Sequence, residues 1–123
     1  MFPSAILRQV AKYQPDLDQT FQALADPTRR LVLERLSLGP ASVSELAEPF
    51  DMALPSFMQH LHVLERSRMV RSEKVGRIRT FHLVPQNLET AGSWLGAQLE
   101  VWHKRLDQFD AYIKELAKEK NND

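Results

Sequence analysis

The spacing of apolar residues along the chain predicts a protein built mainly of helices. In several segments the apolar positions recur at the three- and four-residue intervals of an amphipathic helix, and proline, glycine or capping residues separate these segments. The predicted helices cover residues 3–13, 16–24, 27–38, 43–47, 54–68 and 88–118. One β-rich stretch over residues 70–84 adds a small hairpin, so the pattern predicts a mainly α fold of the α+β type.

Local signals set the boundaries of the central helices. Asp26 followed by Pro27 is an N-cap before a first-turn proline, which marks a helix start. Ser42 and Glu45 have the spacing of a capping box, in which each side chain accepts a hydrogen bond from the other residue's backbone amide. Pro49 has no backbone N–H, so the helix that Ser42 opens should end near residues 47–50.

The predicted helix 54–68 has one apolar and one polar face. At 100° per residue, the inward stripe comprises Leu54, Phe57, Met58, Leu61 and Leu64. The opposite face carries Pro55, Gln59, His62 and Arg66, with Ser56 and Val63 at its flank. Because a short helix and a turn of three or four residues precede it, the segment predicts a helix-turn-helix.

The β-rich stretch predicts a hairpin with a basic tip. Two strands, 70–75 and 78–84, are separated by Gly76-Arg77, and a glycine in the first position of a two-residue loop is typical of a type II′ turn. Lys74, Arg77 and Arg79 therefore lie together at the far end of the hairpin.

The last helix, 88–118, carries a regular heptad of large apolar residues. A domain of this size cannot bury them all by itself, so we expect two copies to associate through this helix. The expected interface comprises Leu88, Leu95, Leu99, Trp102, Leu106, Phe109 and Ile113. The alternative is that this helix packs entirely within its own subunit.

Composition and charge narrow the function. The 123 residues suffice for a single domain, here 1–123, with an N-terminal helical segment 1–26, a core 27–84 and an end, 119–123, expected to be disordered. The formal net charge is zero, but residues 54–84 hold six basic and two acidic side chains, a local net charge of +4. Such an asymmetry favours a surface that faces an anion.

Several classes of function are disfavoured. The chain has no cysteine, which excludes disulfides and thiolate metal sites and fits a reducing cytoplasm. No stretch reaches the roughly 18 apolar residues of a membrane span, and the N-terminal run is not a signal peptide. No phosphate loop, nucleophile elbow or catalytic triad is present, so we expect no catalysis and no cofactor.

The ordered motifs resemble one family. FQALADPTRRLVLERL at 21–36, SVSELAEPF at 42–50, ALPSFMQHLHVL at 53–64, ERSRMV at 65–70 and GRIRTFHL at 76–83 are similar to the ArsR-type winged helix-turn-helix repressors. The resemblance covers about residues 18–118. It implies a winged helix-turn-helix with a long C-terminal dimerisation helix, a homodimeric bacterial repressor, and double-stranded operator DNA as the partner.

The sequence departs from the family's pattern at four positions. Asp51 stands where glycine is common, Ala53 and Met58 where serine is, and Gln59 where lysine or arginine is. Ala53 cannot cap the predicted recognition helix, 54–68, well unless Asp51 takes its place. The operator preference of relatives cannot be carried over.

The resemblance and the helical wheel together assign DNA-binding positions. Ser56 and Gln59 are the first candidates for base contacts, and His62 lies on the same face. His60 matches the family but sits beside the apolar stripe, so a structural role competes with DNA contact. The full set of DNA-binding candidates is Ser44, Pro55, Ser56, Gln59, His60, His62, Lys74, Arg77 and Arg79. Arg29 and Arg30 could also reach phosphate, or pair within the chain.

Two alternatives stay open. A winged-helix module can bind proteins without binding DNA. Glu100, His103 and Asp107 share one face of the last helix and could ligate Zn²⁺ or Ni²⁺ if a second copy adds ligands, which would make the repressor metal-responsive; a solvated helix edge is the plainer interpretation. The sequence identifies no inducer.

Overall fold

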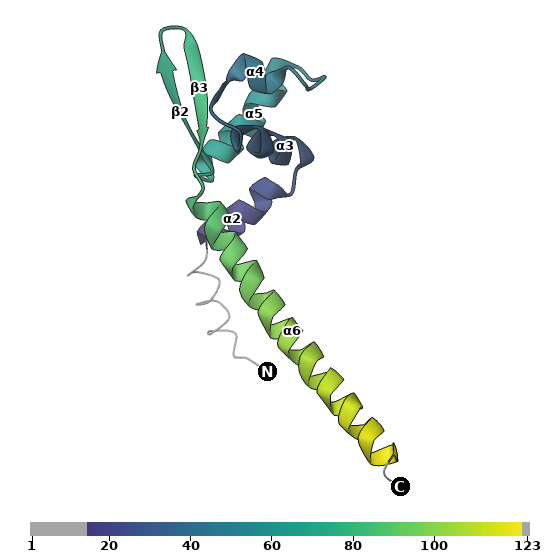
Figure 1. The fold of residues 1–123 in the computed structure, drawn as a ribbon. Helices are drawn as coiled ribbons and strands as arrows, with labels where there is room; N and C mark the ends of the chain where they lie inside the picture. The colour runs from purple at the N-terminus through teal and green to yellow at the C-terminus, as the bar shows by residue number, and fades with distance from the viewer. Residues whose placement is uncertain (1–14, 122–123) are drawn as a thin grey trace, which may run out of the picture. The chain divides into compact units, whose positions relative to one another are not determined.

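The computed structural model describes residues 15–121, so the predicted helix 3–13 lies outside the described residues. A mainly helical fold with a small antiparallel sheet is confirmed (Figure 1). In chain order the elements are α2 (Pro15–Leu24), α3 (Pro27–Leu36), β1 (Ala41–Ser42), α4 (Val43–Ala47), α5 (Leu54–Arg66), β2 (Val70–Val75), β3 (Ile78–Leu83) and α6 (Gln86–Asn121).

The predicted capping signals are confirmed. The Asp26 carboxylate accepts a hydrogen bond of 3.2 Å from the Arg29 amide at the start of α3. At α4, the Ser42 hydroxyl accepts from the Glu45 amide at 3.2 Å, and the Glu45 carboxylate accepts from the Ser42 amide at 3.3 Å. Because α4 ends at Ala47, ahead of Pro49, the turn to α5 spans residues 48–53 and is longer than predicted.

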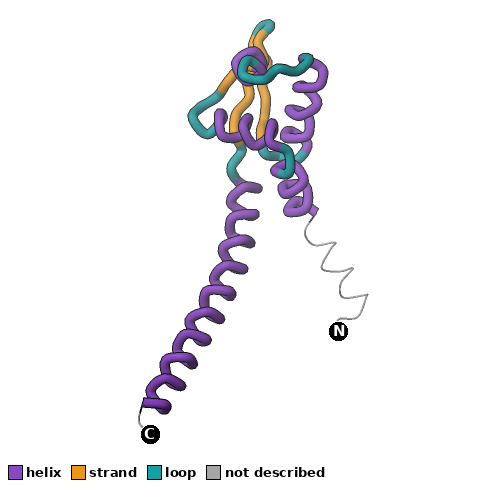
Figure 2. The backbone as a smooth tube through the Cα atoms, turned by 90° about the vertical axis from the view of Figure 1, so that its right-hand side faces the viewer, coloured by secondary structure: helices purple, strands orange, loops and turns teal. Residues whose placement is uncertain are grey.

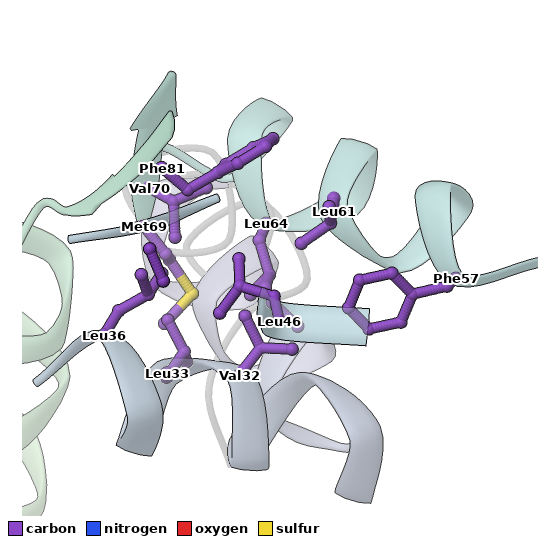
Figure 3. Close-up of a cluster of buried hydrophobic side chains, with 12 residues drawn as sticks. Val32, Leu33, Leu36, Leu46, Phe57, Leu61, Leu64, Met69, Val70 and Phe81 are labelled. Atoms are coloured by element: carbon purple, nitrogen blue, oxygen red, sulfur yellow. The ribbon is translucent and has the colours of Figure 1, made fainter. Parts of the chain in front are cut away.

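The core forms where the inner face of α5 meets α3, α4 and the sheet. Phe57, Leu61 and Leu64 are each at most 1% exposed and belong to one cluster with side chains of α3 and α4 (Figure 3). The inward prediction for Leu54 is wrong, because this first-turn side chain is 55% exposed. Met58 is partly buried at the edge of the cluster.

The sheet contains one strand more than the predicted hairpin. Its order is β1-β3-β2, and the two-residue β1 pairs with β3 through Ala41↔Phe81 and Ser42↔Thr80. In the hairpin, Val75↔Ile78 is the last pair before the turn, and Gly76 has a φ of +65°. Among described residues other than glycine, only Arg68 has a positive φ, so Arg77 does not, and the predicted type II′ turn is supported.

The last helix, α6, is longer than predicted at both ends. Figure 2 shows it as one continuous helix. Residues 119–121, for which the sequence predicted disorder, form the last residues of this helix. The chain divides into two compact units whose boundary falls between Ala91 and Gly92, within this helix. In the first unit, Ala91 is buried and Leu88 packs against the core of its own chain. Over residues 15–121, no helix has both the length and the apolarity to cross a bilayer.

The Asp26 cap predicts a pH-dependent contribution to stability. Burial raises the pKa of Asp26, but the amide hydrogen bond from Arg29 and the charges of His60 and Arg29 outweigh it, so the pKa falls below its ordinary value. The folded-state pKa is then lower than the unfolded one. The stabilisation that ionised Asp26 contributes to the folded state is therefore present above a pH of about 4, and it is lost as the pH falls through the folded-state pKa.

We expect Asp26→Ala to lower the free energy of unfolding by about 1 kcal/mol at pH 7, measured by urea denaturation. Asp26→Asn is the matched control: asparagine also caps helices, so it should retain most of the stability but lose the pH dependence of this residue. Equal stability of Asp26→Ala and the unmodified chain would contradict the prediction.

Candidate nucleic-acid interface

The outer face of α5 carries polar side chains that serve no purpose in the fold. Ser56, Gln59 and His62 are exposed, and in the described part of the chain their side chains have no hydrogen bond or ion pair. Pro55, the fourth predicted residue of this face, is also exposed. Hydroxyl, amide and imidazole groups on one helix face are the donors and acceptors that can read base edges in a major groove.

His60 is placed differently from these residues. Its ring is partly buried, and its Nδ1 lies 3.2 Å from Nη1 of Arg29 and 3.8 Å from the Asp26 carboxylate. Because a guanidinium can only donate, Nδ1 of His60 is the acceptor in this contact. The contact ties α5 to the start of α3, which favours the structural role that its position beside the apolar stripe suggested.

Arg29 and Arg30 are engaged within the chain. Arg29 donates from Nε to the Ala23 carbonyl at 2.8 Å and from Nη2 to the Gln22 carbonyl at 3.0 Å. Arg30 donates from Nη1 to the Leu24 carbonyl at 2.7 Å. Both guanidiniums thus satisfy carbonyls at the C-terminus of α2, where cations also interact favourably with the helix dipole. Of the two roles considered for these arginines, the structure supports intramolecular pairing.

The hairpin β2–β3 brings its three predicted basic residues together. Lys74 lies directly opposite Arg79 in the strand register, Arg77 occupies the turn, and all three side chains are exposed. Figure 1 shows the hairpin beside α4 and α5. Like charges at this spacing repel each other, and a polyanion would relieve the repulsion.

Side-chain hydrogen bonds link the hairpin β2–β3, which we call the wing, to α5, and the sequence did not indicate this link. Arg79 Nη1 donates to the Ser72 hydroxyl at 2.9 Å. That hydroxyl donates to the Glu65 carboxylate, whose oxygens Oε1 and Oε2 lie 3.2 and 3.3 Å away. The side chains come from β3, β2 and the last turn of α5. Only the strand register places Ser72 between the other two, so no signal in the sequence could have revealed the link.

An open hollow of about 860 Å³ separates α5 from the wing. It is lined by Met58, Gln59, His62, Val63, Glu65, Arg66, Arg79 and Phe81. A second hollow has a volume of about 500 Å³. Ser44, at the start of α4, lines it together with Arg77 and Arg79. The candidates on α4, on α5 and on the wing are therefore arranged around two adjoining hollows.

The heptad side chains of α6 beyond Ala91 are exposed in the single chain. Trp102 is 56% and Phe109 62% exposed, and the other members of this set, Leu95, Leu99, Leu106 and Ile113, are each at least 45% exposed. Leu88 was expected in the same interface, but it is partly buried and packs against the core of its own chain.

The possible metal ligands on α6 do not form a site within one chain. Among residues 15–121, no three histidine, cysteine or carboxylate side chains are close enough to hold a metal ion, so Glu100, His103 and Asp107 do not suffice. Glu100 instead lies 3.7 Å from the Lys104 ammonium in an exposed ion pair.

Comparisons with known proteins agree with this geometry. Residues 24–73 match a family model described as a helix-turn-helix domain. The chain is 44% identical over 71 residues to the HTH-type transcriptional regulator Rv2034 of Mycobacterium tuberculosis, a match that covers 58% of this chain and 66%, just under two thirds, of that regulator. It is 28% identical over 79 residues to the transcriptional repressor SdpR of Bacillus subtilis, covering 64% of this chain and 88% of the repressor.

A solved structure also supports the fold. The crystal structure of an ArsR family transcriptional regulator, RHA00566, is 57% identical in sequence and superposes with a TM-score of 0.68. The match covers 72% of this chain and 91% of that one.

The link through Ser72 predicts a small but measurable contribution to stability. Ser72→Ala removes the hydroxyl that accepts from Arg79 and donates to Glu65, so we expect urea denaturation to show a loss of about 0.5–1 kcal/mol. Ser72→Thr retains the hydroxyl and favours a strand, so it should retain the stability. If Ser72→Ala unfolds at the same urea concentration as the unmodified chain, the link contributes nothing to stability and the prediction is wrong.

Proposed function

This chain belongs to the ArsR family of helix-turn-helix transcriptional regulators, and on that premise we propose that it is a homodimeric repressor of an inverted-repeat operator. Membership makes it a DNA-binding regulator and not an enzyme. The observation that carries the proposal is the outer face of α5, whose polar side chains Ser56, Gln59 and His62 have no partner within the described chain.

In the proposed complex, α5 enters the major groove and its N-terminal half faces the bases. Gln59 suits adenine, because its amide NH2 group can donate to N7 while its amide oxygen accepts from the N6 amino group, which makes a bidentate contact. Ser56 can donate or accept. His62 lines the hollow between α5 and the wing together with Arg66 and Arg79, which suits it to the DNA backbone. Ser44 lies near Arg77 and is suited to a phosphate contact.

The wing supplies charge rather than base recognition. Lys74, Arg77 and Arg79 would neutralise phosphates or enter a minor groove, where the potential is strongly negative. Each phosphate that the wing neutralises releases condensed counterions, so the wing should account for part of the salt dependence of binding. A repressor with this partner acts in the bacterial cytoplasm.

The exposed heptad of α6 supports the proposed dimer. The six heptad side chains from Leu95 to Ile113 remain at least 45% exposed in the single chain, and a second copy of the same helix would cover them. A dimer of this kind would place two recognition helices about 34 Å apart, one turn of B-form DNA. The two half-sites of the operator would then be inverted and spaced by about one turn.

We expect Arg77→Ala and Arg79→Ala each to weaken binding to DNA from the protein's own upstream region and to reduce the salt slope by about 1 per lost phosphate contact. Titrations by fluorescence anisotropy at several salt concentrations measure both effects. Lys118→Ala, which removes one charge from the far end of α6, is the control and should leave affinity and slope unchanged. Unaltered slopes for both wing variants would remove the wing from the mechanism.

We expect the full chain to sediment as a dimer at micromolar concentration and Trp102→Asp to sediment as a monomer, because a carboxylate cannot be buried in the apolar seam. Ala111→Asp places the same group on the opposite side of the helix and should remain dimeric. Sedimentation equilibrium distinguishes the two states. A monomeric unmodified chain would overturn the homodimer proposal.

A further inference from the structure

The first turn of α5, the proposed recognition helix, presents an apolar surface that is not buried against the rest of the chain. Ala53, Leu54 and Pro55 are exposed one after another, and Leu54 is 55% exposed. Leu54 belongs neither to the core cluster nor to the partly buried side chains around it. A run of three exposed apolar residues is unfavourable in a folded protein unless it contacts something.

The same turn has few groups that could recognise a base through hydrogen bonds. Ala53 occupies the N-cap position and makes no side-chain hydrogen bond, and Pro55 has no backbone N–H to donate. The first polar side chain of the helix is that of Ser56. Whatever this turn contacts is therefore recognised through an apolar surface.

The position of Leu54 directs it to DNA. It lies one helical turn before Met58, which lines the hollow between α5 and the wing, so the two side chains share a face of the helix. The N-terminal end of a recognition helix is the part that approaches base edges in the major groove. Among the four bases only thymine presents an apolar group there, the C5-methyl group.

We propose that Leu54 is a specificity-determining residue that contacts the C5-methyl group of a thymine in each operator half-site. The inference rests on the proposed function and extends it, because it assigns a base to a residue of the first turn. Leu54 selects thymine by packing, whereas Gln59, further along the helix, selects its base by hydrogen bonds. The half-sites should accordingly contain thymine where the tip of α5 enters the groove.

The test deletes the methyl group from the DNA. The probe is a duplex of the sequence that the full-length protein selects from a random library, in which single thymines are replaced by deoxyuridine. This replacement preserves base pairing and every hydrogen-bonding group and removes only the methyl. We expect one position per half-site to weaken binding about fourfold, as the loss of one buried methyl group predicts.

Leu54→Ala tests the protein side of the same contact. It should weaken binding to the thymine duplex to a similar extent and make binding insensitive to deoxyuridine at that position. Leu38→Ala is the matched control, because Leu38 is 85% exposed and follows α3, outside the helix-turn-helix. This variant should bind both duplexes as the unmodified chain does.

The outcomes separate this inference from the proposed function. Sensitivity to deoxyuridine that disappears in Leu54→Ala supports the contact. A protein that selects a sequence but ignores every deoxyuridine replacement, or whose Leu54→Ala variant keeps the sensitivity, overturns the role of Leu54 and leaves the repressor intact. A protein that selects no sequence from the library overturns the proposed function and the inference with it.

Discussion

Burial of one stripe of α5 determines what the protein presents to its surroundings. Phe57, Leu61 and Leu64 are almost completely removed from solvent, and their packing fixes the rotation of the helix about its own axis. A close-packed core tolerates little change in that rotation. Once it is fixed, Ser56, Gln59 and His62 point away from the core, and the positions of these polar groups follow from apolar contacts in which they take no part.

The hairpin obeys a similar constraint. Phe81 is buried and lies opposite Ser72, and the next pair on the same face is Lys74 and Arg79. Shifting the register by one residue would turn Phe81 to solvent and carry the basic pair to the other face. The link from Arg79 through Ser72 to Glu65 then joins the wing to the last turn of α5. The hairpin and α5 are therefore held together by polar contacts as well as by the core.

Much of this arrangement was predictable because its signals are local. The Asp26 cap, the Ser42–Glu45 capping box and the turn at Gly76 each depend on residues close together in sequence, and each is found in the structure. The periodicity of α5 likewise predicted three of its buried residues. It failed at Leu54, because a first-turn residue has no preceding turn of its own helix and here no neighbouring element covers it.

The features that escaped prediction depend on distant parts of the chain. Strand β1 has only two residues, too few for an alternating pattern, and it forms because Ala41 and Ser42 meet β3. The Glu65–Ser72–Arg79 link and the contacts of Arg29 with α2 and His60 join residues that only the tertiary structure brings together. The continuation of α6 to Asn121 shows that a polar, lysine-rich tail can remain helical.

The lack of intramolecular partners on the outer face of α5 has a further consequence. Substitutions at Ser56 or Gln59 break no side-chain contact within the described chain. These two residues can therefore be replaced with little change in the free energy of unfolding. His60, one position later, is bound to Arg29 and lacks this freedom. Under the proposed function, operator preference can therefore be re-engineered on this helix surface without added stabilisation elsewhere in the molecule.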